Sequence, residues 1–216
     1  MTPQILYEDN HVLVAIKPPN VPSQADSSQD ADMLTLLKAY IAHKYHKPGA
    51  VYLGLVHRLD RPASGLMVFA RTSKAAGRLS QQMRDGTFEK RYRLLCESVP
   101  VAQSGIWEDT LVKLPGNFVR VVPSGTPGGK AAALRYRTLQ VYPGGQALCE
   151  VELLTGRAHQ IRVQFASRGH ALVGDARYGC GGRQLALWSY QLVFDHPTQK
   201  TRLRFAQDAP SSLLLP

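Results

Sequence analysis

Short apolar segments of strand length, separated by turns rich in glycine and proline, constrain this fold more than any other feature of the sequence. Residues 88–96 are an example, because alternation along this segment puts Lys90, Tyr92 and Leu94 on one face of a strand. We expect strands at the following segments: 5–7, 12–16, 52–56, 66–70, 88–96, 107–112, 118–122, 132–141, 146–154, 183–194 and 201–205. Such a series of short strands joined by tight turns favours antiparallel pairing.

Three segments between these strands carry helical signals. We expect the first helix to begin near Asp30 or Asp32 and to stop at Pro48-Gly49. Ser73 is expected to cap the second helix, and the third covers residues 158–168. The residues expected to face the core are Leu34, Leu37, Ile41 and Tyr45 in the first helix, Ala76, Leu79 and Met83 in the second, and Ala158, Ile161 and Phe165 in the third. The sequence therefore predicts an α+β fold, a single domain over residues 1–216 with a largely antiparallel mixed sheet, flanking helices and a central cleft.

The charge balance points to a class of partner. The chain has 26 lysines and arginines against 16 aspartates and glutamates, a formal net charge of +10, and this excess favours a polyanion such as RNA or DNA. A basic protein with a solvated surface and no nucleic acid is the alternative that charge alone leaves open. The hydrophobic content of 44% is ordinary for a globular protein and argues against wholesale disorder.

The three cysteines, Cys96, Cys149 and Cys180, stand apart, and no Cys-x-x-Cys pair indicates a zinc or dithiol site. A sparse, odd count of cysteines is typical of buried thiols in a reducing cytoplasm. The N-terminus lacks the pattern of a signal peptide, and no apolar run approaches the ~18 residues that a membrane span needs. We therefore expect a cytoplasmic, monomeric protein without a membrane partner.

Residues 57–65, His-Arg-Leu-Asp-Arg-Pro-Ala-Ser-Gly, place one acid, Asp60, among three cations in a turn between two apolar runs. Guanidinium groups nearby favour the charged form of a carboxyl, so we expect Asp60 to stay ionised near neutral pH. An ionised carboxylate serves as a nucleophile or a base better than as a proton donor. The alternative is a surface aspartate in a salt-bridged turn.

Arg162 falls on the apolar stripe of the third predicted helix, four residues after Ala158. A guanidinium is almost never buried without a partner, so either its head escapes to water along an apolar surface or a carboxylate must reach it. Asp60 and Asp175 are the two acids in loops between apolar segments, and Asp60 has the stronger charged surroundings. The sequence therefore predicts that Asp60 pairs with Arg162.

Other candidate residues each have two interpretations. Tyr92 belongs either to a site or to the core, with its hydroxyl at the rim. His57 and His159 are each either an acid–base group or a hydrogen-bonding support for the neighbouring loop. No histidines have metal-ligand spacing, and no phosphate-binding glycine loop or dinucleotide fingerprint occurs. We therefore expect no metal and no nucleotide cofactor.

Four motifs in this order resemble the RluA-type pseudouridine synthases. They are His-Arg-Leu-Asp-x-x-x-Ser-Gly at 57–65, Lys90-Arg91-Tyr92, Gly156-Arg157-x-His159-Gln160-Ile161-Arg162 and Gly174-Asp175-x-x-Tyr178-Gly179. The similarity extends over nearly the whole chain, from Glu8-Asp9 to His196-Pro197. The family usually has threonine at the position of Ala63 and often histidine at that of Trp188. Many relatives also carry an N-terminal S4 RNA-binding domain, which we do not expect here.

The resemblance implies an isomerase that converts specific uridines of structured RNA, either ribosomal or transfer RNA, into pseudouridine in a central catalytic cleft without a cofactor. Asp60 would be the essential carboxylate, Arg162 would hold it ionised and aimed, and Tyr92 would stack on the uracil. Arg58 would enter the stack that the extruded uridine leaves. The substrate-binding residues that the resemblance implies are His57, Arg58, Arg157, His159, Gln160 and Ile161.

Two other functions stay open on the sequence. A catalytically silent RNA-binding module would use the same cleft, although such a relative could have lost Asp60 or Tyr92, and both are present. A nuclease or glycosidase would need a second carboxylate near the first, and we expect none there.

Overall fold

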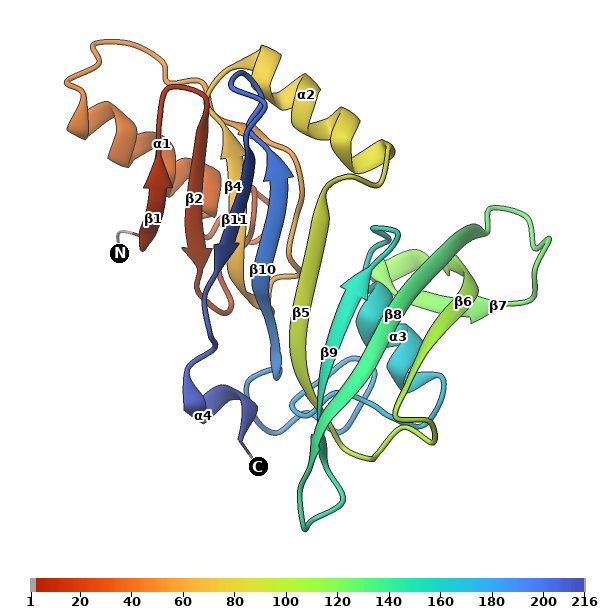
Figure 1. The fold of residues 1–216 in the computed structure, drawn as a ribbon. Helices are drawn as coiled ribbons and strands as arrows, with labels where there is room; N and C mark the ends of the chain where they lie inside the picture. The colour runs from red at the N-terminus through yellow and green to blue at the C-terminus, as the bar shows by residue number, and fades with distance from the viewer. Residues whose placement is uncertain (1–2, 216) are drawn as a thin grey trace. The chain divides into compact units, whose positions relative to one another are not determined.

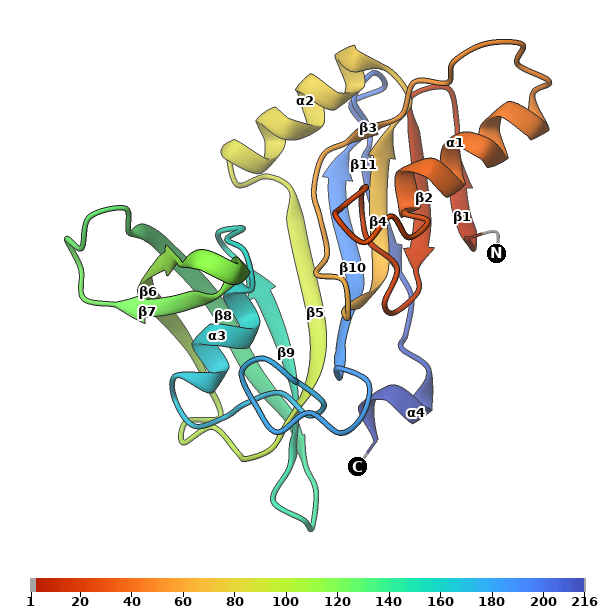
Figure 2. The same cartoon turned by 180° about the vertical axis from the view of Figure 1, so that it is seen from behind.

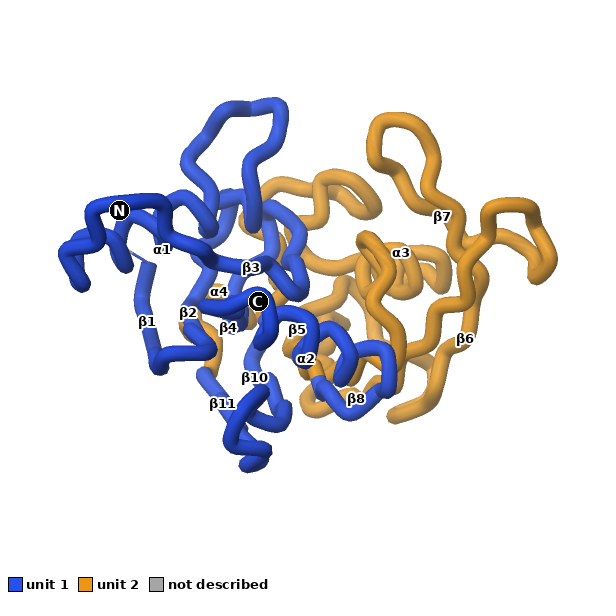
Figure 3. The backbone as a smooth tube through the Cα atoms, turned by 90° about the horizontal axis from the view of Figure 1, so that it is seen from above, with its two compact units in different colours: residues 1–89, 189–207 blue, residues 90–188, 208–216 orange. Residues whose placement is uncertain are grey.

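The structure is a computed structural model that describes residues 3–215. The chain forms two compact units: residues 1–89 with 189–207, and residues 90–188 with 208–216 (Figure 3). Each unit has its own strands and helices, and the single domain expected over residues 1–216 stays a prediction. Within residues 3–215, no helix has the length and apolar character needed to cross a membrane.

The first unit is built on a largely antiparallel sheet (Figure 1). Its strands follow the order β1-β2-β4-β10, while β3 pairs with β4 and β11 pairs with β10. Their bounds are Ile5–Glu8 (β1), Val12–Lys17 (β2), Gly54–Leu55 (β3), Ser64–Ala70 (β4), Leu187–Asp195 (β10) and Arg202–Ala206 (β11). Strand β4 lies inside the sheet and all of its residues are buried, which explains its purely apolar sequence after Ser64.

Two helices complete the first unit. Helix α1 (Met33–Lys44) lies on one face of the sheet, and α2 (Ser73–Arg84) packs against β3 and β4 (Figures 1 and 2). The carboxylate of Asp32 accepts backbone N–H groups at the start of α1, and the hydroxyl of Thr72 accepts one at the start of α2. These side chains satisfy donors that a helix end otherwise leaves without a partner, which fixes where each helix begins.

Helix α2 begins one residue earlier than predicted, because Thr72 and not Ser73 is the capping residue. The buried stripe shifts accordingly: Ala75 is buried in place of Ala76, and Met83 is only half-buried. The predicted cap was therefore wrong by one position. Both residue types cap helices well, so the sequence alone does not separate them.

Two tyrosines that the sequence placed on buried elements are exposed. Tyr45 lies after the end of α1 and is 44% exposed. Tyr52 is 50% exposed and precedes β3, which has two residues in place of the five predicted for residues 52–56. A short apolar run does not by itself distinguish a buried strand from a loop that covers one.

The second unit contains an antiparallel series of strands in the order β5-β9-β8-β6-β7. Their bounds are Glu89–Cys96 (β5), Ser104–Lys113 (β6), Val119–Val122 (β7), Lys130–Val141 (β8) and Ala147–Leu153 (β9), with a short helix η1 (Pro115–Asn117) between β6 and β7. Helix α3 (Gln160–Ala166) lies on one face of these strands and packs against β6 and β7 (Figure 2), and α4 (Ser211–Leu214) follows near the C-terminus. Part of the core is the cluster of Leu111, Val119, Ala132 and Val163.

Helix α3 is shorter than predicted and begins at Gln160. His159 has a left-handed backbone with φ of 51°, so the helix cannot extend back through it, and Ala158 is exposed rather than part of the apolar stripe. Ile161 and Phe165 are buried as predicted. Together the two units confirm the predicted α+β class with a largely antiparallel sheet. Cys180 is exposed, contrary to the expectation of buried thiols.

Candidate active site

In the first unit, Asp60 lies in the loop before β4, and hydrogen bonds tie this loop to residues 17–23. The hydroxyl of Ser23 accepts the N–H of Leu59 at 3.2 Å and donates to the carbonyl of Leu59 at 2.8 Å. The N–H of Asn20 donates to the carbonyl of Arg61 at 2.9 Å. The backbone on both sides of Asp60 is therefore held in place, although the residue lies in a loop.

The side chain of Lys17 makes a further tie and is fully buried. Its Nζ donates to the carbonyls of Pro18 at 3.0 Å, Val21 at 2.7 Å and Arg61 at 2.8 Å. Burial lowers the pKa of Lys17 to about 7. The negative charge of Asp60 opposes this shift, and the positive charge of Arg61 adds to it. Three carbonyl acceptors match the three N–H donors of an ammonium, whereas a neutral amine has only two.

The two arginines that flank Asp60 have different surroundings. Arg61 forms ion pairs with Asp30 and, at 3.6 Å, with Asp26 in the exposed loop that follows residue 23. Arg58 is exposed and has no hydrogen bond or ion pair with any of residues 3–215. Arg61 therefore anchors a loop, while Arg58 presents its guanidinium to solvent.

His57 supports strand β4. Its Nε2 accepts the N–H of Val68 at 3.0 Å, and its ring lies 6.0 Å from that of Phe88. The supporting role is therefore the one that the contacts favour over acid–base chemistry at Nε2. Nearby, Gly65 has a φ of 114°, and a Cβ there would lie 2.4 Å from the carbonyl oxygen of Ser189, so only glycine fits.

In the second unit, Arg162 is 5% exposed and forms a bidentate pair with Asp175, which is 1% exposed. The distances are 2.8 Å from Nε to Oδ2 and 2.7 Å from Nη2 to Oδ1. Burial would raise the pKa of Asp175, but hydrogen bonds and charge from Arg162 and the backbone N–H groups of Arg177 and Tyr178 hold this pKa below its ordinary value. The prediction that a buried Arg162 has a carboxylate partner is confirmed with Asp175, and its pairing with Asp60 stays a prediction.

Tyr178 links this ion pair to the start of α3. Its ring lies 5.2 Å from the guanidinium carbon of Arg162. Its hydroxyl accepts the N–H of Val119 at 2.9 Å and lies 2.8 Å from Nδ1 of His159. The contact with the Tyr178 hydroxyl makes His159 a support for this loop.

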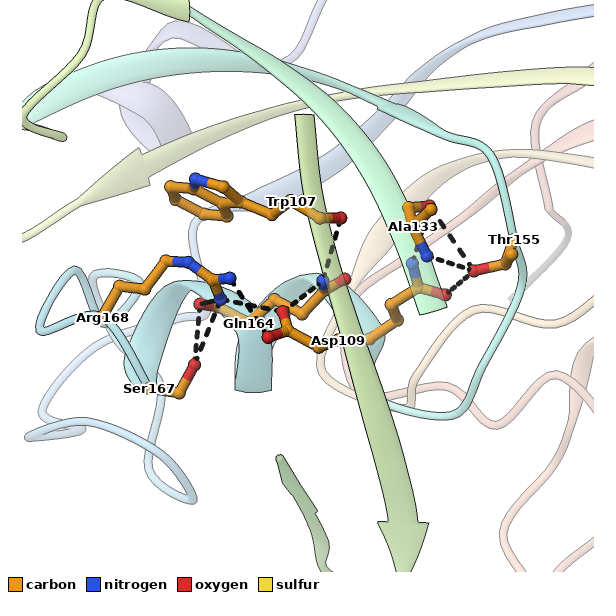
Figure 4. A network of polar contacts seen from close by, with 8 residues as sticks. Trp107, Asp109, Ala133, Thr155, Gln164, Ser167 and Arg168 are labelled. Atoms are coloured by element: carbon orange, nitrogen blue, oxygen red, sulfur yellow. Dashed lines mark hydrogen bonds and ion pairs between the residues drawn. The ribbon is translucent and has the colours of Figure 1, made fainter. Parts of the chain in front are cut away.

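Gln160 holds the loop before α3 against strand β8. Its Oε1 accepts the N–H of Arg157 at 2.9 Å and the hydroxyl of Thr155 at 2.8 Å, and its Nε2 donates to the carbonyl of Ala133 at 3.0 Å. Figure 4 shows the further contact in which the N–H of Ala133 donates to the Thr155 hydroxyl, at 2.9 Å. Gln160 is 2% exposed, so it stabilises the motif from within.

The other end of α3 is tied to β6 (Figure 4). The carboxylate of Asp109 accepts hydrogen bonds from Gln164 at 2.7 Å and from Arg168 at 2.8 and 3.1 Å. The guanidinium of Arg168 also lies 4.6 Å from the ring of Trp107. Polar contacts therefore fix α3, which carries Arg162, at both of its ends.

The remaining predicted site residues have different exposures. Tyr92 is 4% exposed on β5, and Ile161 is 4% exposed on α3. Arg157 is exposed, and its Nε donates to the carbonyl of Ala131 at 2.8 Å. Sequence reasoning assigned no site role to Lys17 or Asp175, although Asp175 lies in the fourth motif. The signals were a lysine that ends an apolar run before Pro-Pro, and an acid directly after a glycine.

Comparison with known proteins decides the family. Residues 11–167 match the family described as RNA pseudouridylate synthase. The chain belongs to this family. It is 31% identical to ribosomal large subunit pseudouridine synthase D of Zymomonas mobilis subsp. mobilis, over 98% of this chain and 71% of that protein. It is 33% identical to the uncharacterized RNA pseudouridine synthase YhcT of Bacillus subtilis, over 89% of this chain and 64% of that one.

A solved structure agrees with the fold. Human RNA pseudouridylate synthase domain containing 4 superposes with a TM-score of 0.79 over 97% of this chain and 90% of that chain, at 21% identity. The resemblance to RluA-type pseudouridine synthases is therefore confirmed, and with it the class of isomerases that act on RNA.

Proposed function

We propose that this protein isomerises specific uridines of RNA to pseudouridine with Asp60 as the reacting carboxylate. The observation that carries the assignment is the anchored loop: Lys17 and Ser23 bind the backbone on either side of Asp60. A carboxylate held at a defined position is what a reaction at one atom of a substrate requires. Membership of the family supports the reaction class.

The reaction exchanges one bond for another within the same nucleotide. The glycosidic bond between C1′ and N1 breaks, the uracil turns in place, and a bond forms between C1′ and C5. C5 loses a proton and N1 gains one, so the atoms balance without an oxidant, a reductant or a second substrate. The carboxylate of Asp60 would act as a nucleophile or as a base in these steps.

We propose that Arg162 holds Asp60 in its ionised form. The pair with Asp175 uses Nε and Nη2 of Arg162, and a guanidinium has five N–H donors, so it can bind a second carboxylate in addition to Asp175. The guanidinium of Arg162 keeps its proton at neutral pH. Asp175 and Tyr178 restrict the position of this guanidinium. Both oxygens of Asp175 are bound, which disfavours a two-acid hydrolytic mechanism.

The substrate uridine must leave its stack, because C1′ and C5 are inaccessible in stacked RNA, and extrusion costs a few kcal/mol. Arg58 is exposed two residues before Asp60 in the sequence and would fill the vacated position in the stack. Tyr92 would stack on the extruded uracil. Ribosomal RNA is the first substrate class to test, because the Zymomonas relative is named for the large ribosomal subunit, and transfer RNA is the second.

Release of label from RNA that carries tritium at C5 of its uracils tests the proposal. The unchanged protein should release tritium, and Asp60→Asn should abolish release. Asp26→Asn, which alters an exposed acid of the same unit, is the matched control and should retain it. Arg162→Met should lower the rate by at least about 100-fold, as expected for loss of a charged group that orients the reacting carboxylate.

Free uracil or cleaved RNA would refute isomerisation, and unchanged release by Asp60→Asn would refute the assigned residue. RNA binding without any release of label would instead indicate a catalytically silent RNA-binding module.

A further inference from the structure

Lys90 is a charged residue of the second unit that the contacts described so far do not explain. It is half-buried on β5, and it has no hydrogen bond or ion pair within residues 3–215. Burial lowers the pKa of its ammonium. By contrast, Lys17 has three carbonyl acceptors and Arg162 has a carboxylate. An ammonium that is partly removed from water without an acceptor is unfavourable unless a ligand supplies one.

Gly156 leaves room beside this ammonium. A Cβ at residue 156 would lie 3.3 Å from Nζ of Lys90, closer than ordinary van der Waals contact. Gly156 does not have a positive φ, so its backbone conformation does not require glycine. Gly156 is also exposed, which means that Nζ lies next to a part of the surface that a ligand can reach.

No acidic side chain of the neighbouring strand compensates for Lys90. Glu152 on β9 pairs with Arg135 at 2.7 Å, and Asp175 is bound by Arg162. The exposed Arg157 lies next to Gly156 and adds a second positive charge. These acids are therefore already compensated by arginines, and an anion from outside the described chain can supply the acceptor for Lys90.

We propose that Lys90, at the gap left by Gly156, binds a phosphodiester group of the RNA next to the substrate uridine. Lys90 lies on the same face of β5 as Tyr92, two residues and about 7 Å away along the strand. If Tyr92 stacks on the uracil, this spacing sets the ammonium beside that nucleotide. Phosphate is the only anion in an RNA chain, and an ammonium binds it more strongly than a neutral uracil carbonyl. The inference rests on the proposed function for the identity of the ligand.

Equilibrium binding in an Asp60→Asn background tests this without turnover. The probe is a short RNA with one uridine flanked by cytidines, and its affinity is measured by fluorescence anisotropy over a range of salt concentrations. Lys90→Met should weaken binding about tenfold and reduce the slope of log affinity against log salt by about 0.7, the value for one contact to a single strand. Lys38→Met, which removes an exposed lysine of α1, is the charge-matched control and should change affinity less.

A neutral methylphosphonate in place of the phosphodiester on either the 5′ or the 3′ side of the uridine identifies the contact. At one of these positions it should weaken binding about tenfold when Lys90 is present and have no further effect in Lys90→Met. The proposal would be overturned if, at both positions, the methylphosphonate weakened RNA binding equally in proteins with lysine and with methionine at residue 90. An unchanged affinity of Lys90→Met at every salt concentration would also overturn it.

Gly156→Ala gives an independent check. The added methyl should displace Nζ by a few tenths of an ångström and weaken RNA binding when residue 90 is lysine, but have no effect in Lys90→Met. An equal effect in both backgrounds would contradict the role of the gap. Because these measurements concern binding, they can succeed while tritium release fails, in which case the proposed function is refuted and the phosphate site is not.

Discussion

The two units each bury a cation, and they stabilise it in opposite ways. Lys17 in the first unit donates to three neutral backbone carbonyls, whereas Arg162 in the second donates to the carboxylate of Asp175. Carbonyl dipoles replace water only in part, so the pKa of Lys17 falls to about 7, while Arg162 stays charged. The first arrangement can therefore titrate near neutral pH, and the second persists until Asp175 is protonated in acid.

Asp175→Asn should have the largest effect on stability. Removing one partner of a buried ion pair takes away the carboxylate that compensates the Arg162 charge most directly, which costs about 3–5 kcal/mol in the free energy of unfolding. Denaturant titration measures the loss. Asp109→Asn is the control, because its pair with Arg168 is partly exposed and should contribute no more than about 1 kcal/mol. Equal losses in the two variants would show that burial does not distinguish these ion pairs.

Lys17→Met should be less destabilising, with a loss of about 2–4 kcal/mol, because three partly buried carbonyls lose their donor but no charge is left uncompensated. The same titration measures it, with Lys38→Met on the exposed face of α1 as the control. Substitution at an exposed site should change the free energy of unfolding by about 0.5 kcal/mol or less. If the two lysine variants behave alike, the carbonyl contacts do not hold the loop.

A third effect should appear in the pH dependence of stability. Between pH about 7 and 10.5, native Lys17 binds fewer protons than the unfolded chain does, so raising the pH increases the free energy of unfolding of the unchanged protein relative to Lys17→Met. In the acid range, the lowered pKa of Asp175 means that its ion pair contributes to the free energy of unfolding. This contribution is lost as the pH falls through the pKa of Asp175 in the folded protein. Denaturant titrations at several pH values check both. A stability difference between the unchanged protein and Lys17→Met that is constant from pH 7 to 10 would contradict the first expectation.

Local pattern predicted most of the strands and the burial of Arg162, because alternation and helical spacing depend only on neighbouring residues. Local pattern did not predict helix bounds or pairings that depend on a single backbone conformation or on a contact with a distant residue. The left-handed backbone of His159 shortens α3, and no propensity encodes it. Asp175 lies in a loop, and its pairing with Arg162 depends on how that loop folds back onto α3. Likewise, the burial of Lys17 depends on the carbonyl of Arg61, 44 residues away.

The sequence separations of the two cation sites have a consequence for how the chain folds. Arg162 and Asp175 are 13 residues apart, whereas Lys17 and Arg61 are 44 apart. Loop closure entropy grows with the logarithm of length, so the shorter loop costs about 1 kcal/mol less to close. The guanidinium pair can therefore form early during refolding as a local nucleus, while the lysine contacts must wait until distant segments meet.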